Sequence, residues 1–303
     1  MTLPALESDD AVSFESHRAH LTGLAYRMLG SLADAQDAVQ DAYLRWRQAD
    51  RDGVADPRAF LTKVVSRICL DRLKSARQRR ETYIGPWLPE PVLGMDEFSA
   101  ETASEYADDL STGFLLALER LTPLERVAFL LHDVFDMDFA EISALTDRSE
   151  AACRQLASRA RRHIRDARPR VSVSVEDEDR LLKAFLAAAR SGEVGGLARL
   201  LAEGASLYSD GGGKASAARN VLHGRDRVAR FISGIFRKFR NRATVSITAG
   251  RINGMPGLIT RYADGSMDTT ALEVRGDEIV SVFITRNPDK LRHLSRGVSP
   301  RGD

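Results

Sequence analysis

The sequence is poor in cysteine and has no long apolar run. Its 303 residues include two cysteines, Cys69 and Cys153, both within predicted helices. Two isolated cysteines exclude a disulfide framework. Because neither they nor the six scattered histidines have the spacing of metal ligands, we expect no metal, and we expect no cofactor. No apolar run approaches the roughly 20 residues of a membrane span. The acidic start, MTLPALESDDAVSFE, lacks the basic and apolar parts of an export signal. We therefore expect a cytoplasmic chain with no membrane partner.

The formal net charge of +1 hides three strongly charged blocks. Residues 58–80 carry eight Lys or Arg against one acid, and residues 148–170 carry eight Arg against two acids. Between these two basic blocks, residues 90–109 carry seven acids and no Lys or Arg. Two basic blocks separated by an acidic, Pro-containing stretch indicate two nucleic-acid contacts joined by a tether.

The second basic block closes a predicted helix-turn-helix. Thr122, Pro123 and Glu125 form a helix start with a capping box. A short helix over 139–145 follows, and Ser149 then caps a third helix that runs to about residue 166. Helix, short helix, tight turn and helix is the helix-turn-helix arrangement.

The third helix of this motif divides into an apolar face and a cationic face. Cys153, Leu156 and Ile164 share the apolar face, while Arg154, Ser158 and the later arginines lie opposite. A solvated surface helix normally mixes charges for i,i+4 pairing. Arginine suits phosphate oxygens and guanine edges in the major groove. We favour DNA binding over a basic face that only confers solubility.

Two N-terminal helices carry opposite charges. Ser31 caps a helix whose outer ridge holds Asp34, Asp37, Gln40 and Asp41; acids stabilise any helix start, so the ridge alone leaves protein docking and helix stabilisation equally open. A long helix opens at Pro57, and its polar face is nearly all positive, as expected beside a phosphate backbone. Its candidate DNA-binding residues are Arg58, Lys63, Arg67 and Lys74.

The chain after residue 170 changes character. Helices are predicted over 173–190, 195–202 and about 225–239, followed by strands over 244–252, 257–262, 267–274 and 278–285 with hairpin turns between them. This order predicts an α+β cone whose curved antiparallel sheet wraps a pocket. The segment GGGKAS is no Walker phosphate loop, because Tyr208 stands at the required glycine and Ala215 at the magnesium ligand. Six polar residues are candidates for the pocket: Tyr208, Asp210, His223, Asp226, Tyr262 and Asp268.

Several segments resemble the extracytoplasmic-function sigma factors of the sigma-70 family. DAQDAVQDAYLRW is similar to region 2.2, PRAFLTKVVSRICLDRLKSARQRR to region 2.4, and FAEISALTDRSEAACRQLASRARRHIR to the region 4 helix-turn-helix. The C-terminal block resembles the SnoaL-like fold. Together with WLPEP (87–91), DGGGK (210–214) and NPDKL (287–291), it is similar to the subgroup of sigma factors with a fused SnoaL-like extension.

The resemblance implies a role for each block. The acidic ridge Asp34, Asp37, Gln40 and Asp41 would dock on the RNA polymerase core, formed by the β and β′ subunits. The basic helix would engage the −10 element of promoter DNA, although Arg67 stands where many relatives carry Asn. The −35 element would be contacted by Arg148, Ser149, Arg154, Gln155, Ser158, Arg161 and Arg162.

The resemblance also implies regulation in cis. WLPEP has more apolar residues than a free linker would carry, so we expect it to pack against the folded protein. Candidate interdomain regulatory residues are Trp87, Leu88, Pro89, Asp210, Gly211, Gly212, Gly213, Lys214, Asn287, Pro288, Asp289 and Lys290. Asn287 and Pro288 are predicted to open a helix. A small-molecule ligand in the pocket is a further candidate partner.

The predicted fold class is therefore multidomain: two all-α domains followed by an α+β SnoaL-like cone. The predicted boundaries are 10–84 for region 2, 85–112 for the linker, 113–169 for region 4 and 174–296 for the SnoaL-like domain. We expect no enzyme and no catalytic residue. Two alternatives remain: a ligand-responsive helix-turn-helix repressor or activator, and a SnoaL-like isomerase or cyclase fused to a DNA-binding module.

Overall fold

The structure is a computed structural model that describes residues 6–49, 54–94, 109–167, 173–238 and 244–295. Side chains are described from residue 14 on, except over 74–81 and 166–167. It divides into two compact units. The helical unit comprises residues 1–81 and 95–168, and the C-terminal unit comprises residues 82–94 and 169–303. Segment 82–94, which includes WLPEP, thus belongs to the same unit as the C-terminal domain.

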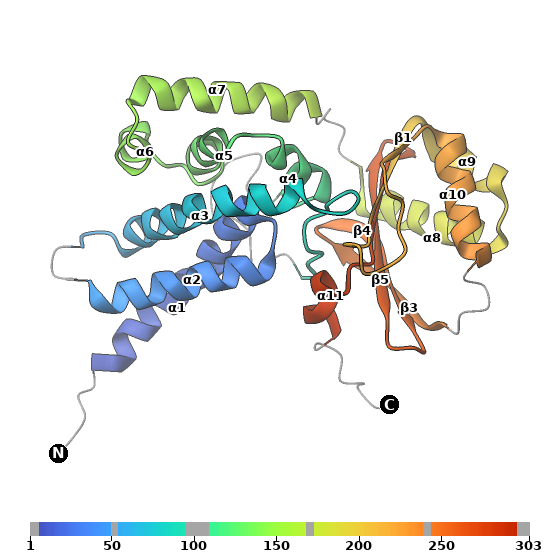
Figure 1. Ribbon diagram of the computed structural model, residues 1–303, viewed down its shortest axis with the longest axis horizontal. Helices are drawn as coiled ribbons and strands as arrows, with labels where there is room; N and C mark the ends of the chain where they lie inside the picture. The colour runs from blue at the N-terminus through green and yellow to red at the C-terminus, as the bar shows by residue number, and fades with distance from the viewer. Residues whose placement is uncertain (1–5, 50–53, 95–108, 168–172, 239–243, 296–303) are drawn as a thin grey trace, which may run out of the picture. The chain divides into compact units, whose positions relative to one another are not determined.

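Three N-terminal helices pack side by side in the helical unit: α1 (Leu6–Leu29), α2 (Leu32–Gln48) and α3 (Pro57–Glu81) (Figure 1). Gly30 takes a left-handed φ of 68° between α1 and α2, and the Ser31 side chain caps α2 as predicted. The three helices share a core that includes Leu24, Val39 and Leu61, all essentially inaccessible to solvent.

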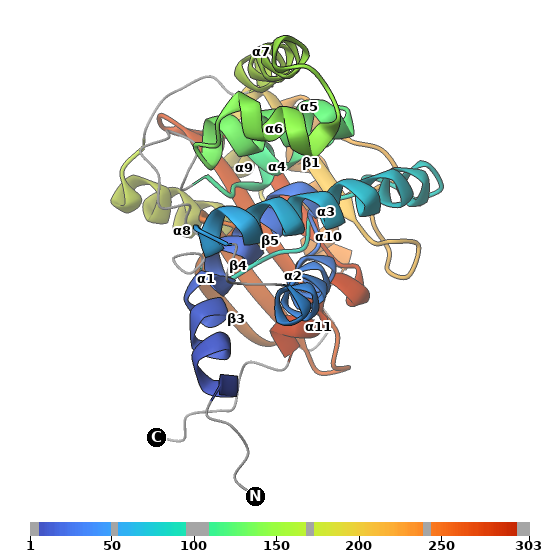
Figure 2. The same ribbon diagram turned by 90° about the vertical axis from the view of Figure 1, so that its left-hand side faces the viewer.

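The helix-turn-helix contains α5 (Pro123–Phe129), α6 (Phe139–Thr146) and α7 (Glu150–Ala167), preceded by α4 (Thr112–Glu119). In both views α7 lies on α5 and α6 (Figures 1 and 2). The predicted capping box of Thr122 and Glu125 is present in full. One departure is a π-helical turn, η3 (Leu130–Val134), where the prediction had ordinary helix. The Phe135 N–H donates to the Leu130 carbonyl five residues back, which widens the turn that leads into α6.

The two halves of the helical unit contact each other through a buried arginine. Arg126 on α5 is 2% exposed, and its guanidinium donates to the Met28 carbonyl at the end of α1 and to Glu119 of α4. Burial lowers the pKa of Arg126 to about 9. Nearby, the His20 ring of α1 stands edge-on to Phe135, with 5.0 Å between ring centroids.

The C-terminal unit is an α+β cone. Helices α8 (Val175–Ser191), α9 (Val194–Leu200) and α10 (Arg225–Lys238) cover one face of a curved sheet (Figures 1 and 2). The strands are β1 (Leu201–Asp210), β2 (Leu222–His223), β3 (Thr244–Ile252), β4 (Met255–Tyr262), β5 (Met267–Arg275) and β6 (Glu278–Thr285), and α11 (Pro288–Ser295) closes the described chain. Their order in the sheet is β2-β1-β6-β5-β4-β3.

Two details of this sheet differ from the sequence prediction. β1 begins at Leu201, where a helix was expected to continue to residue 202. The apolar run before it suits a helix or a buried strand equally, and Leu201 is fully buried beside Ile279 of β6. β1 also pairs with β6 in parallel, although the remaining pairs are antiparallel. In the part of the chain that the structure describes, no helix has the length and apolar character to cross a membrane.

Candidate functional site

The acidic ridge lies along the outer side of α2. Asp37 and Gln40 are exposed, while Asp34 and Asp41 are half-buried. Arg72 of α3 explains part of this difference, because its guanidinium donates to the Asp34 carbonyl and to the Asp41 carboxylate at 2.9 and 2.6 Å. Asp37 and Gln40 are therefore the ridge residues most open to a partner.

The cations of α3 occupy different environments. Arg67 is exposed and has no ion pair or hydrogen bond with the residues that the structure describes. Lys63 forms an ion pair of 2.9 Å with Glu141 of α6, so the basic helix and the helix-turn-helix contact each other directly. Arg58 points its Nη2 at the Nδ1 atom of His20 at 3.2 Å. The Lys74 side chain lies outside the described residues.

Helix α7 and the two residues before it present most of the predicted −35-binding residues to solvent. The exposed members are Arg148, Ser149, Arg154, Gln155, Ser158 and Arg162. Arg154 stacks over the Phe139 ring at 5.3 Å and pairs with Glu150. Arg161 lies differently: its Nε donates to the Asp133 carboxylate of η3 at 2.5 Å, so this arginine is held against its own domain.

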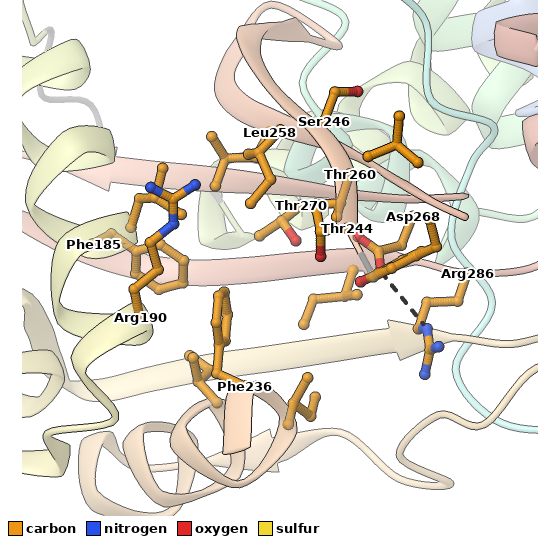
Figure 3. Close-up of a pocket in the computed structure, with 17 residues that line it drawn as sticks. Phe185, Arg190, Phe236, Thr244, Ser246, Leu258, Thr260, Asp268, Thr270 and Arg286 are labelled. Carbon is orange, nitrogen blue, oxygen red and sulfur yellow. Dashed lines mark hydrogen bonds and ion pairs between the residues drawn. The ribbon is translucent and has the colours of Figure 1, made fainter. Parts of the chain in front are cut away.

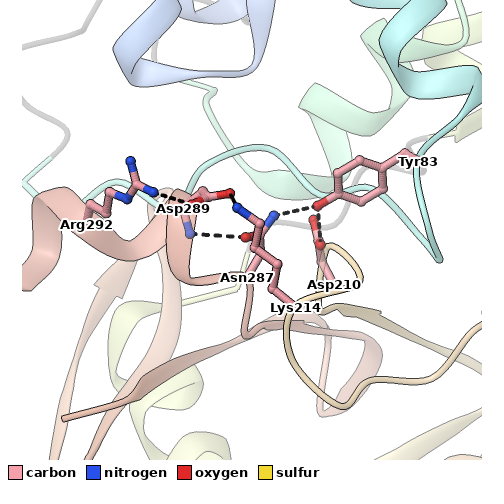
Figure 4. Close-up of polar contacts among 6 residues, drawn as sticks. All are labelled: Tyr83, Asp210, Lys214, Asn287, Asp289 and Arg292. Atoms are coloured by element: carbon pink, nitrogen blue, oxygen red, sulfur yellow. Dashed lines mark hydrogen bonds and ion pairs between the residues drawn. The ribbon is translucent and has the colours of Figure 1, made fainter.

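Segment 82–94 is bound to the C-terminal unit through a buried aspartate. Asp210, at the end of β1, is fully buried and accepts a hydrogen bond from the Tyr83 hydroxyl at 2.6 Å (Figure 4). It also accepts from the Leu88 N–H at 2.9 Å. Lys290 of α11 pairs with the same carboxylate at 2.7 Å and also donates to the Leu88 carbonyl. The Lys290 ammonium lies over the Trp87 ring, 4.3 Å from its centroid. Burial and the hydrogen bond to Asp210 raise the pKa of Tyr83. We call Tyr83, Trp87, Leu88, Asp210 and Lys290 the Asp210 cluster.

The glycine loop after Asp210 allows this close approach. Gly212 has a φ of 58°, and a Cβ there would overlap the Asn287 amide and lie 3.0 Å from the Tyr83 hydroxyl oxygen. Asn287 donates to that same hydroxyl at 2.8 Å and caps α11 by accepting from the Asp289 N–H. Lys214 pairs with Asp289 (Figure 4). DGGGK and NPDKL thus meet around the Tyr83 side chain.

Sequence reasoning missed three residues of the contact between segment 82–94 and the rest of the C-terminal unit: Tyr83 in the segment, and the segment's partners Asn253 and His293. Tyr83 precedes WLPEP and carried no motif signal. Asn253 was read only as part of a hairpin turn, yet its side chain accepts from the Val92 N–H at 3.1 Å and its own N–H donates to the Val92 carbonyl at 2.9 Å. His293 contacts the Pro91 carbonyl through Nε2 at 2.7 Å. The left-handed φ of 52° at Asn253 suits both the turn and this contact.

A pocket of about 430 Å³ lies between the sheet and helices α8 and α10 (Figure 3). Of the six predicted pocket residues, Tyr262 and Asp268 line it. The expectation was wrong for four others. Asp210 lies in the Asp210 cluster, Tyr208 stacks on Phe283, and His223 and Asp226 line a separate surface hollow. Tyr262 donates to Asp268 at 2.6 Å, and Arg286 stands 4.0 Å from the same carboxylate.

The described residues offer no candidate metal site. None of them form a group of three or more His, Cys, Asp or Glu that could hold a metal ion. Burial raises the pKa of Cys69, which keeps this thiol protonated and inert. The main surface features of the described residues are the acidic ridge on α2, the exposed cations of α7 and the pocket of the C-terminal unit.

Comparison with known proteins agrees with this arrangement. The Sigma-70 region 2 family model matches residues 13–80, and the Sigma-70 region 4 model matches residues 112–164. The chain is 40% identical over 288 residues to the ECF RNA polymerase sigma factor SigJ of Mycobacterium tuberculosis, covering 91% of each. It is 31% identical over 292 residues to the probable ECF RNA polymerase sigma factor SigI of that organism, covering 94% of this chain and 95% of SigI. The SigJ crystal structure superposes with a TM-score of 0.73 and 35% identity, covering 93% of this chain and 98% of that chain.

Proposed function

This chain belongs to the extracytoplasmic-function sigma factors of RNA polymerase, which direct transcription initiation. On that premise we propose which of its surfaces bind the polymerase core and promoter DNA. The ridge on α2, with Asp37 and Gln40 at its centre, binds the polymerase core. The cationic side of α3, including Arg67, binds the −10 element. The exposed residues of α7 read the −35 element. The C-terminal unit regulates these contacts in cis.

The energy for strand opening comes from binding. Unstacking bases costs about a few kcal/mol per step. The glycine loop, which could have suggested a nucleotide site, is instead packed around Tyr83 and Asn287. The linker joins two duplex contacts, so binding of the first raises the effective concentration of the second at the promoter. Together with core polymerase, these contacts supply the energy for strand opening. Each contact alone weakens steeply with salt, because it depends on displaced counterions.

Promoter binding replaces contacts within the helical unit. Lys63 pairs with Glu141, so this −10 cation is engaged by the helix-turn-helix until DNA competes for it. The Lys63 and Glu141 side chains are 43% and 37% exposed. Such surface ion pairs contribute about 0–1 kcal/mol to the free energy of folding. A phosphate oxygen can therefore displace Glu141 at little cost.

The Asp210 cluster is the observation that carries the proposed regulation. Segment 82–94 lies between α3 and the acidic linker that leads to α4, so it is part of the chain that joins the two DNA-binding parts. Its hydrogen bonds to Asp210, Asn253 and His293 occur along its length, and Leu88 and Val92 are 1% and 3% exposed. By holding this segment, the C-terminal unit restricts the tether and so regulates initiation.

The C-terminal unit acts through binding and not through catalysis. Its pocket is lined by one carboxylate, Asp268, which already accepts from Tyr262 and pairs with Arg286. No described lining residue is a histidine that could serve as its acid or base partner. We propose that this pocket binds a small-molecule ligand.

The test is run-off transcription with core polymerase and a promoter library. The proposal requires RNA synthesis that depends on this chain, loss of core binding in Asp37→Lys, and retained core binding but altered promoter choice in Arg154→Ala. Asn287→Ala, which removes the Tyr83 contact and leaves the sheet intact, is expected to change output at a fixed promoter. No change in Asn287→Ala and in a chain ending at Arg170 would overturn the regulatory part.

A further inference from the structure

The pocket of the C-terminal unit has two chemically different ends. Asp268 and Arg286 lie at one end (Figure 3). The Tyr262 hydroxyl donates to Asp268, so the tyrosine and the arginine both compensate the charge of the aspartate. Arg190, from the last turn of α8, lies at the other end and is exposed. It has no ion-pair or hydrogen-bond partner in the described part of the chain. One end is thus charge-balanced, and the other carries a cation without a balancing acid.

The walls between these ends are apolar. Phe185 and Leu186 of α8 and Ile235 and Phe236 of α10 face Leu258 and Ile284 on the sheet. The volume of about 430 Å³ falls within the range of roughly 300–1,000 Å³ typical of small-molecule sites. A ligand that fills this space must bury a largely apolar body.

The floor of the pocket adds hydroxyl groups. Thr260 and Thr270 lie on neighbouring strands and point into the pocket (Figure 3). Neither side chain is hydrogen-bonded to another residue among those the structure describes. They offer donors and acceptors to one or two oxygens on the body of the ligand.

We infer that this pocket binds a small, mainly apolar organic acid, with its anionic group at Arg190 and its apolar body between Phe185, Phe236 and the sheet. The inference rests on the proposed ligand-binding role of the pocket and adds the chemical class. A cation in the last turn of a helix is favourable by itself through the helix dipole. Arg190 could therefore serve only to stabilise α8. Two probes that differ only in an anionic group distinguish this stabilising role from recognition of an anion.

The experiment uses the full chain and two fluorescent probes with the same ring system. 1-Anilinonaphthalene-8-sulfonate carries an anionic group, and N-phenyl-1-naphthylamine lacks it. We expect both probes to bind and the sulfonate probe to bind more tightly. Arg190→Gln should weaken the sulfonate probe about two- to fivefold, as expected for an exposed charge pair, and leave the uncharged probe unchanged. Arg180→Gln, which removes an exposed arginine of the same helix outside the pocket, should change neither.

A blocking variant tests whether the probes occupy this pocket. Ile235 is half-buried on α10, so Ile235→Trp can fill the cavity while the thermal unfolding midpoint checks that the unit is folded. Loss of both probes in this variant supports the site. Equal affinity of the sulfonate probe for Arg190→Gln and the parent chain would overturn the acid class and leave the pocket role standing. Failure of both probes to bind the parent chain, or binding unchanged by Ile235→Trp, would overturn both.

Discussion

Helix α7 of the helical unit and the Asp210 cluster of the C-terminal unit use charge in opposite ways. In the helical unit the arginines of α7 lie mostly on the surface, and Arg148, Gln155 and Arg162 are exposed. In the C-terminal unit the central charges are buried: Asp210 is fully inaccessible and Lys290 is 8% exposed. A buried charge must be compensated within the fold, whereas an exposed cationic face can gain by meeting a polyanion. Charge density along the sequence therefore does not distinguish binding surfaces from structural clusters, and burial does.

The largest effect is expected at Asp210. Asp210→Ala leaves the Lys290 ammonium buried without its carboxylate and removes the acceptor for Tyr83 and the Leu88 N–H. Removing one partner of a buried pair costs about 3–5 kcal/mol. We expect a lower unfolding midpoint and faster amide hydrogen exchange at Leu88.

The control for Asp210 is Asp226→Ala, which removes an exposed carboxylate from the first turn of α10. Its effect on unfolding should be small. An unfolding midpoint in Asp210→Ala equal to that of this control would show that the buried cluster does not stabilise the unit.

The next effect compares two arginines of one helix. Arg154→Ala is expected to weaken promoter binding by about 1–3 kcal/mol, the usual worth of a base contact, with little change in stability. Arg161→Ala removes the ion pair with Asp133 and is expected to lower stability by about 1 kcal/mol. Promoter titrations and denaturant melts measure the two quantities separately. If Arg154→Ala and Arg161→Ala lost the same promoter affinity and the same stability, the distinction between exposed and inward-facing arginines would be wrong.

A smaller effect concerns the pH dependence of the helical unit. Burial and the nearby Arg58 guanidinium lower the pKa of His20 to about 4, against an ordinary value of 6.5. Its Nδ1 accepts from Arg58, which leaves the proton on Nε2 beside Thr62. The folded state then binds fewer protons than the unfolded chain between pH 6.5 and 4. Stability should fall as the pH drops through this window, by about 2 kcal/mol.

The measurement is the free energy of unfolding across this pH range in the parent chain and in His20→Gln. The variant keeps a hydrogen-bonding side chain but does not titrate, so its profile should be flatter by that amount. Parallel profiles would show that carboxylates, and not His20, cause the loss.

The smallest effect is expected at the Lys63–Glu141 ion pair. Glu141→Gln frees Lys63 for DNA and should raise promoter affinity about two- to threefold at low salt, because exposed pairs contribute well under about 1 kcal/mol and are screened. Titrations at two salt concentrations would measure this gain and its disappearance. A decrease in affinity would instead mean that Glu141 supports the bound state.

Local signals in the sequence predicted the elements well, and long-range contacts account for what they missed. The caps at Ser31 and Thr122 and the turn at Asn253 depend on neighbouring residues, so short stretches of sequence contain the information. The WLPEP segment was correctly expected to pack against the folded protein. Its partners Asp210 and Lys290 were among the candidates that the family resemblance supplied. Local sequence patterns alone do not reveal them, because Leu88 and Asp210 are 122 positions apart.

The inward turn of Arg161 has a similar cause. On a helical wheel it belongs to the cationic face, but η3 brings Asp133 within reach of its guanidinium. The π-helical geometry that places this acid has no sequence signal in the pattern of apolar residues. Whether an arginine of α7 faces solvent or pairs within its own domain therefore depends on the path of η3 beside it.

Arg286 joins the pocket to the segment that the C-terminal unit holds. Its side chain lines the cavity beside Asp268, and its backbone N–H donates to the Asp210 carbonyl at 2.7 Å, next to that of Asn287. A single residue therefore forms part of the pocket wall with its side chain and fixes the end of β1 with its backbone. A substitution that displaces the Arg286 backbone is expected to disturb both places at once.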